Sequence, residues 1–168
     1  FFLYMAYNAP HWPLHAKPAD IAKYKGKYDA GWDELRKLRF ENIKKLGLAN
    51  EDWNLFKDKL LPSWDSLAAE EKKQWTLKME VYAAMVDNLD QNIGKLLDYL
   101  ESTQQLDNTV IVFLSDNGAE NLDVGKMPFT VKRKEGPVGT AGSMEAYTKN
   151  WAQVSNSPLR NYKSSPYE

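Results

Sequence analysis

Apolar residues spaced by threes and fours run from residue 75 to residue 100 and predict the longest helix of the chain. At 3.6 residues per turn, this stripe covers about seven turns. Glu70 and Glu71 fall in the first turn, where acidic side chains interact favourably with the helix dipole, and Asp65 or Ser66 is predicted to cap the start. The apolar positions are Trp75, Met79, Tyr82, Val86, Leu89, Ile93, Leu96 and Leu100.

A second amphipathic pattern lies in "DAGWDELRKLRFENIKKLGL", residues 29 to 48. We expect a helix that ends at Gly47, because glycine readily adopts the left-handed conformation that closes a helix. Residues 48 to 66 predict an irregular connector around Pro62, with a short helix from Glu51 to Lys59. The apolar face of the helix is assigned to Leu35, Leu38, Ile43 and Leu46.

Two continuous apolar runs predict buried strands, one at residues 1 to 7 and one in "TVIVFLS", residues 109 to 115. The second run follows the long helix after the turn "QQLDN". A helix that leads into a fully apolar strand is typical of a parallel sheet covered by helices. The pattern therefore predicts the α/β fold class.

Glycine and proline become frequent between residues 120 and 144, where no periodicity is visible. This segment predicts a long exposed loop, with Lys132, Arg133 and Lys134 in a solvated turn. A more ordered pattern resumes in "WAQVSNSPLRNYK", residues 151 to 163.

Composition narrows the class of protein only slightly. The 168 residues suffice for one domain with a core, and a formal net charge of −1 gives no indication of a nucleic-acid partner or an anionic membrane. The absence of cysteine excludes disulfides and thiolate chemistry, and no stretch reaches the roughly 18 apolar residues of a membrane span. Six Trp and nine Tyr either pack in the core or line a carbohydrate or aryl site.

Asp-Asn pairs occur three times, at residues 87–88, 107–108 and 116–117. The first lies inside the long helix, where a solvated or helix-packing role is expected, and the second precedes a strand, where such residues form turns. Only Asp116 and Asn117 lie at the carboxyl end of a predicted buried strand, the edge at which open α/β sheets bind ligands. A carboxylate and an amide oxygen suit Ca²⁺ or Mg²⁺. The alternative is an ordinary turn, in which Gly118 lets the backbone turn tightly.

His11 also follows a predicted strand, in "APHWP", where prolines fix the backbone. A histidine held in this way can act as a general acid or donate a hydrogen bond to an anion. The alternative is a histidine packed against Trp12. His15 is predicted to lie at the surface.

Five strings of this chain, taken together and in order, resemble consecutive blocks of the formylglycine-dependent sulfatases, of the arylsulfatase type and the alkaline phosphatase superfamily. The resemblance covers most of the chain except residues 120 to 144, which vary in the family. It implies a mixed sheet with helices packed on both faces. The strings are "APHWPLHA", "KYKGKYDAGWDELRKLR", "MEVYAAMVDNLDQNIGKLLDYLE", "LDNTVIVFLSDNGAE" and "WAQVSNSPLRNYKSSPYE".

The resemblance also assigns roles to four residues. It implies a Ca²⁺ ion, with Mg²⁺ or Mn²⁺ as alternatives, held partly by Asp116 and Asn117 as the Asp and Asn of the "SDNG" block. His11, from the "APH" block, contacts the sulfate ester near its leaving oxygen and is a candidate proton donor. Lys163, from "LRNYK", binds the sulfate. A point charge of this kind suits an anionic oxygen.

The family's nucleophile is a hydrated formylglycine made from a Cys/Ser-x-Pro-x-Arg motif, and this chain contains no such motif. The nearest string, "NSPLR" at residues 156 to 160, has asparagine at the modified position, and we interpret it as a coincidence. In the family the nucleophile and a further acidic pair precede the "APH" block. We therefore expect residues 1–168 to be an internal segment of a sulfatase catalytic domain, inactive by itself, with formylglycine supplied from upstream.

The expected partners are a small-molecule or glycan sulfate ester and the remainder of the sulfatase chain, with neither nucleic acid nor a membrane span. Periplasmic or extracellular location is common in the family, although no local feature indicates it. Two alternatives remain open: a phosphomonoester or phosphonate hydrolase of the same superfamily, and a non-catalytic sulfatase-like binding module.

Overall fold

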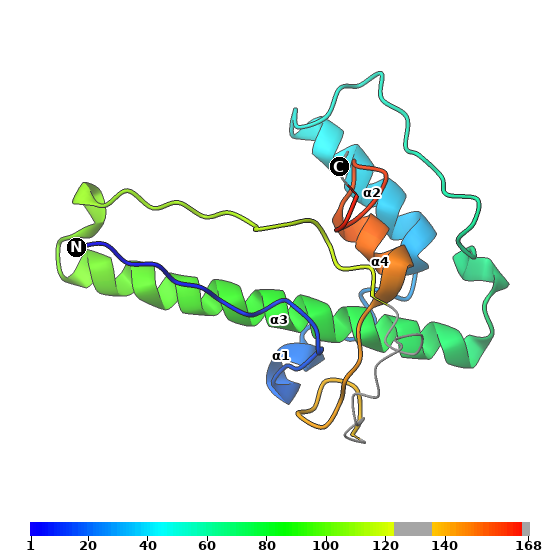
Figure 1. The fold of residues 1–168 in the computed structure, drawn as a ribbon, viewed down its shortest axis with the longest axis horizontal. Coiled ribbons are helices and arrows are strands. Elements are labelled where there is room, and N and C mark those ends of the chain that lie inside the picture. The colour runs from blue at the N-terminus through cyan, green and yellow to red at the C-terminus, as the bar shows by residue number, and fades with distance from the viewer. Residues whose placement is uncertain (123–135, 166–168) are drawn as a thin grey trace.

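The computed structural model describes residues 1–122 and 136–165. One long helix, α3, forms the axis of the molecule, and the other helices pack near its middle and its N-terminal half (Figure 1). Helix α1 packs on α3, and α2 packs on α4. The helices are α1 (Pro18–Ala22), α2 (Gly31–Lys45), α3 (Ala69–Ser102) and α4 (Thr148–Ser155), with short 3-10 helices η1 (Trp64–Ser66) and η2 (Leu106–Asn108).

The core is built around tryptophans that meet edge to face. Trp151 of α4 is fully buried, and its ring lies 5.7 Å from that of Trp32 and 5.9 Å from that of Trp64. Its indole N–H donates to the backbone carbonyl of Trp75 at 3.1 Å, so the polar atom of this buried ring is satisfied. Most of the Trp residues are thus core, as one of the two sequence interpretations predicts.

Gly31 shows how tightly this core is packed. A Cβ atom at this position would lie 2.1 Å from Cγ of Trp64, and the φ of Gly31 is +77°. Both the conformation and the close approach of the ring therefore require glycine at the start of α2.

Helix α2 ends as predicted, with Gly47 at a φ of +71° and its N–H bonded to the carbonyl of Lys44. The predicted apolar face was only partly right, because Leu35 packs against the core whereas Leu38 and Leu46 are exposed. The buried positions are Trp32, Arg36 and Phe40, spaced by four residues. Arg36 is buried because its guanidinium donates to the carbonyls of Phe56 and Leu159 and to the side chain of Gln153, which apolar spacing alone does not reveal.

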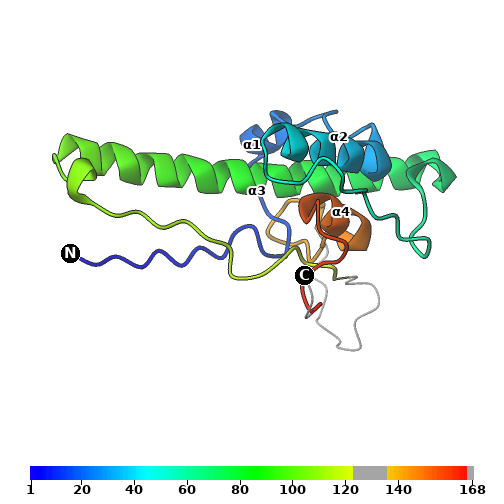
Figure 2. The same ribbon diagram turned by 90° about the horizontal axis from the view of Figure 1, so that it is seen from above.

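The predicted strands at residues 1 to 7 and 109 to 115 were wrong, since no strand forms among the described residues. Both segments are extended and run in the same direction along the C-terminal half of α3 (Figures 1 and 2). Phe2 is 92% exposed and Val110 91%, so their side chains are not buried either. A strand needs the N–H and C=O groups of a neighbouring strand, and neither segment has a ladder with the other.

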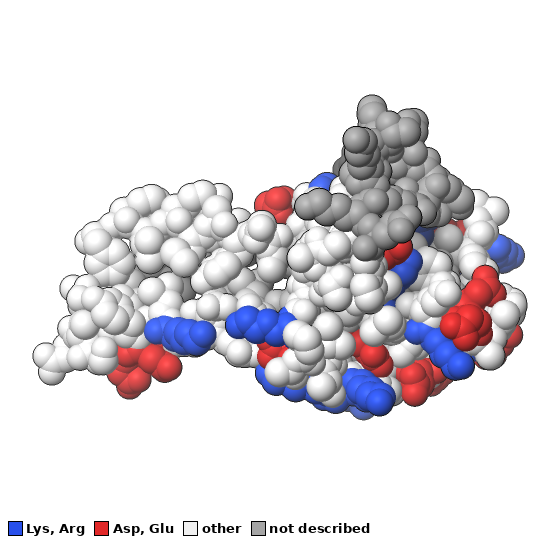
Figure 3. Space-filling model, turned by 90° about the horizontal axis from the view of Figure 1, so that it is seen from below, with Lys and Arg blue, Asp and Glu red and all other residues white. Residues whose placement is uncertain are grey.

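The two extended segments also carry no charged residue between positions 1 and 9 or 108 and 115. Figure 3 shows an uncharged surface over much of one end of the molecule, with charged side chains along the lower edge of that end and elsewhere on the visible face. The α/β architecture that the resemblance implies is therefore not formed by the described residues, which are mainly helical.

The structure also differs from the predictions for the start of α3, its apolar stripe and the helix at residues 51 to 59. Helix α3 is not capped by Asp65 or Ser66, which lie in η1; instead the side chain of Glu71 accepts from the N–H of Ala68 at 2.9 Å. Its predicted apolar stripe is partly exposed at Val86. The predicted helix at residues 51 to 59 does not form. No described helix is long and apolar enough to cross a membrane.

The predicted exposed loop at residues 120 to 144 is partly packed. His15 pairs with Gly139 in a parallel bridge, and its Nε2 lies 2.7 Å from the carbonyl of Ser143, a residue only 2% exposed. The prediction that His15 is a surface residue was therefore wrong. The basic run at residues 132 to 134 lies outside the described residues.

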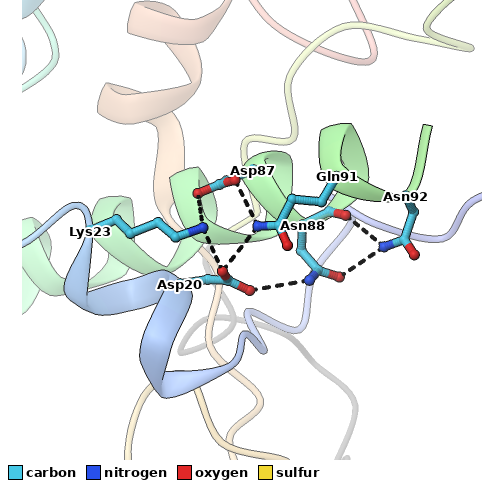
Figure 4. Close-up of polar contacts among 6 residues, drawn as sticks. All are labelled: Asp20, Lys23, Asp87, Asn88, Gln91 and Asn92. Carbon is cyan, nitrogen blue, oxygen red and sulfur yellow. Dashed lines mark hydrogen bonds and ion pairs between the residues drawn. The ribbon is translucent and has the colours of Figure 1, made fainter. Parts of the chain in front are cut away.

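A polar network fastens α1 to α3 (Figure 4). Asp20, which is buried, accepts hydrogen bonds from Asn88 and Gln91 at 3.1 Å each and pairs with Lys23 at 2.8 Å. Lys23 also reaches Asp87 at 3.0 Å. The Asp87-Asn88 pair thus takes part in helix packing, one of the two roles expected from the sequence.

Acid should weaken this network. The hydrogen bond from Lys23, followed by that from Gln91, lowers the pKa of Asp20 from 3.8 to about 2. A carboxyl whose pKa is lower in the folded state stabilises the fold above its unfolded pKa, and this contribution is lost as the pH falls towards the folded pKa. We expect Asp20→Asn to flatten the decrease in the free energy of unfolding between about pH 4 and pH 2, measured by urea denaturation. Glu34→Gln, at an exposed helical ion pair, is the control. It should leave the slope of the free energy of unfolding against pH unchanged. Equal slopes for Asp20→Asn and the parent protein would contradict this account.

Candidate functional site

The loop at residues 115 to 118 leaves two oxygen ligands available. The hydroxyl of Ser115 donates to the carbonyl of Asn117 at 2.7 Å, and the Asn117 amide nitrogen donates to the carbonyl of Gly118 at 3.3 Å. Both Asp116 and Asn117 are exposed. No hydrogen bond or ion pair to the rest of the described chain engages the Asp116 carboxylate.

The side-chain oxygens of Asp116 and Asn117 are of the kind that bind a hard divalent cation. The Asp116 carboxylate has no partner among the described residues. The Asn117 amide uses its nitrogen locally, which leaves its Oδ1 as an acceptor. Across residues 1–122 and 136–165, no three His, Cys, Asp or Glu side chains gather as a metal cluster. Asp116 and Asn117 could therefore supply only part of a coordination shell, which Ca²⁺ fills with six to eight oxygens.

A second loop, at residues 156 to 163, lies directly against the first. The N–H of Lys163 donates to the carbonyl of Ala119 at 2.9 Å, and the N–H of Ala119 donates to Oδ1 of Asn156 at 2.8 Å. These bonds bring Lys163 beside the loop of Asp116 and Asn117, although 46 residues separate Asn117 from Lys163 in the sequence.

The ammonium of Lys163 pairs with Glu120 at 3.3 Å, and both side chains are partly buried, 31% and 18% exposed. Glu120 also accepts from the N–H of Asn121 at 2.9 Å. A bound anion would have to share Lys163 with this carboxylate. The sequence interpretation missed Glu120, although it lies only four residues after Asp116.

Gly118 is needed for a different reason from the one the sequence suggests. It is not among the glycines with positive φ, so a left-handed turn does not require it. A Cβ atom at Gly118 would instead lie 2.9 Å from Nδ2 of Asn156 and 3.4 Å from the backbone nitrogen of Lys163. Glycine permits the two loops to touch.

His11 is exposed, and its ring is oriented by its neighbour. Its Nδ1 lies 2.6 Å from the carbonyl of Trp12, an acceptor only, so Nδ1 carries a proton and Nε2 remains to face a ligand. The His11 and Trp12 rings are 5.8 Å apart and tilted by 30°, which matches the packing alternative as well. No hydrogen bond within the described residues joins His11 to Asp116, Asn117 or Lys163.

Comparison with known proteins gives consistent matches. The family model described as Sulfatase matches residues 1–165. An uncharacterized sulfatase of Schizosaccharomyces pombe is 41% identical over 95% of this chain and 31% of its own length. The arylsulfatase of Klebsiella aerogenes is 37% identical over 96% of this chain and 36% of its own length. An N-acetylglucosamine-6-O-sulfatase of Bacteroides thetaiotaomicron is 37% identical over 52% of this chain. The chain spans about a third of the length of the first two relatives, 31% and 36%.

Proposed function

The chain belongs to the sulfatase family, and on this premise we propose that residues 1–168 supply part of the active site of a sulfuric ester hydrolase. The observation that carries the proposal is the backbone bond between Lys163 and Ala119. It holds the backbone of Lys163 beside the loop that carries Asp116 and Asn117. This supports the proposal, because a sulfate monoester needs both a cationic side chain and oxygen ligands for a metal ion.

Each residue then has a defined task. Lys163 offers positive charge to a sulfate oxygen. His11 holds a proton on Nε2 when charged and donates it to the leaving alcohol oxygen, a contribution of about 10²- to 10⁴-fold for general acids. Asp116 and Asn117 would hold a Ca²⁺ ion, which when bound supplies charge stabilisation to the sulfate oxygens.

The nucleophile would come from elsewhere in a longer polypeptide. Formylglycine arises from cysteine or serine in a Pro-x-Arg context, and the 168 residues contain no such motif. Residues 1–168 therefore form a segment of the catalytic domain in this proposal. The natural ester is a small molecule or a glycan, the class that the names of the relatives suggest.

The test compares two substrates and two lengths of chain. We expect a full-length polypeptide containing residues 1–168 to hydrolyse 4-nitrophenyl sulfate faster than 4-nitrophenyl phosphate, because the nucleophile and metal ligands are complete. The 168-residue chain alone should show no turnover above the blank, because it lacks the nucleophile. Release of 4-nitrophenol is the measurement.

Each departure from this result has a clear meaning. Faster hydrolysis of the phosphate ester would support a phosphomonoester hydrolase instead. Binding of sulfated ligands without turnover by the full-length protein would support a non-catalytic module. Activity of the purified 168-residue chain would show that the assignment of the nucleophile is wrong.

A further inference from the structure

Asn156 occupies a position that the sequence interpretation dismissed. It follows the last residue of α4, and its N–H donates to the carbonyl of Ala152 at 2.9 Å. Helix α4 is anchored in the core, since Trp151 and Ala152 are both fully buried. The helix therefore holds the backbone of Asn156 in a fixed place at the border between core and loops.

The side-chain amide of Asn156 connects both loops of the proposed site. Its Oδ1 accepts from the N–H of Ala119 at 2.8 Å, and its Nδ2 donates to the carbonyl of Asn161 at 3.0 Å. Ala119 lies two residues after Asn117, and Asn161 lies two residues before Lys163. The absence of a side chain at Gly118 admits the amide, because a Cβ there would lie 2.9 Å from Nδ2.

An amide is the group that this position needs. It carries one acceptor and one donor on a short, planar side chain, so it can bond to a backbone N–H and a backbone C=O together. Aspartate has the same shape but only acceptors, and it would face the Asn161 carbonyl with a second oxygen. Alanine would break both bonds.

We propose that Asn156 is a positioning residue for sulfate ester hydrolysis, which sets the loop of Asp116 and Asn117 against the loop of Lys163. This inference rests on the proposed function. Asn156 acts through its neighbours and does not touch the substrate. Groups that orient metal ligands from behind typically change metal affinity or activity by about 10- to 100-fold.

The experiment uses Asn156→Asp and Asn156→Ala in a full-length polypeptide containing residues 1–168. We expect a decrease of about 10- to 100-fold in kcat/KM for 4-nitrophenyl sulfate and a similar weakening of Ca²⁺ binding, measured by calorimetry. Hydrogen exchange at the amides of Ala119 and Lys163 should accelerate in Asn156→Ala. In Asn156→Asp the Ala119 amide should remain protected, because an oxygen still accepts its proton.

The matched control is Asn150→Ala on the same helix, whose amide donates to the carbonyl of Pro62 at 3.1 Å, remote in sequence from both loops. Any decrease in kcat/KM of this variant should be no larger than its decrease in the free energy of unfolding accounts for. Its Ca²⁺ affinity should be unchanged. If the parent protein is active and both Asn156 variants keep its kcat/KM and Ca²⁺ affinity, the inference fails. If the parent protein lacks sulfatase activity, the proposed function fails. Two measurements, hydrogen exchange at the amides of Ala119 and Lys163 and the Ca²⁺ affinity, then still test whether Asn156 aligns the loops. Unchanged exchange and Ca²⁺ affinity would then reject the alignment as well.

Discussion

Replacing Asp116 with alanine should lower sulfatase activity of the full-length polypeptide by at least about a hundredfold, since losing even a residue behind a metal ligand costs about 10- to 100-fold. The side chain is exposed and makes no hydrogen bond or ion pair with the other described residues. Its removal should therefore leave the free energy of unfolding unchanged without metal. The measurements are kcat/KM for 4-nitrophenyl sulfate and the Ca²⁺ dissociation constant.

Asp107 provides the control, because it belongs to another Asp-Asn pair, is also exposed and lies in the turn η2. Asp107→Ala should change neither activity nor Ca²⁺ affinity. If Asp116→Ala keeps more than half of the parent activity, Asp116 is not a metal ligand, and the ordinary-turn interpretation of residues 115 to 118 is correct.

Replacing Trp151 with alanine should have the largest effect on stability. The ring is fully buried among Trp32 and Trp64, and its N–H is bonded to the carbonyl of Trp75. Truncating a buried tryptophan costs about 3–5 kcal/mol, which is a large share of the roughly 5–15 kcal/mol that stabilises a typical domain. Urea denaturation of the parent and variant proteins measures the difference.

Trp53 is the matched control, since it is the same residue type and is 52% exposed. Trp53→Ala should change the free energy of unfolding by no more than about 0.5 kcal/mol. A loss below about 1 kcal/mol in Trp151→Ala, well under the range for buried tryptophan, would show that the tryptophans do not form the stabilising core.

The candidate site could be predicted from the sequence only where residues carry their own chemistry. The sequence predicts Asp116 and Asn117 as oxygen ligands because they follow an apolar run, and the family resemblance adds Lys163. Asn156 and Glu120 were missed, because their partners are distant in sequence and their residue types are common on surfaces. Asn156 accepts a hydrogen bond from Ala119, 37 positions away in the sequence, and no local pattern predicts such a contact.

The sequence by itself determined the two longest helices, α2 and α3. Spacings of three and four in α3, and the glycine that ends α2, are local features, since helical hydrogen bonds join residues four apart. Local spacing did not determine the buried face of α2. Arg36 is buried there because its guanidinium donates hydrogen bonds to the carbonyls of Phe56 and Leu159, which are distant in the sequence.

Only the tertiary structure decided the rest. The apolar runs at residues 1 to 7 and 109 to 115 remain extended and exposed, because a strand exists only when another strand supplies its hydrogen bonds, and that partner is not given by the run itself. The meeting of Lys163 with the loop of Asp116 likewise depends on the packing of α4 and on the amide of Asn156. Local spacing fixes helices, whereas strand pairing and the alignment of loops depend on residues far apart in the chain.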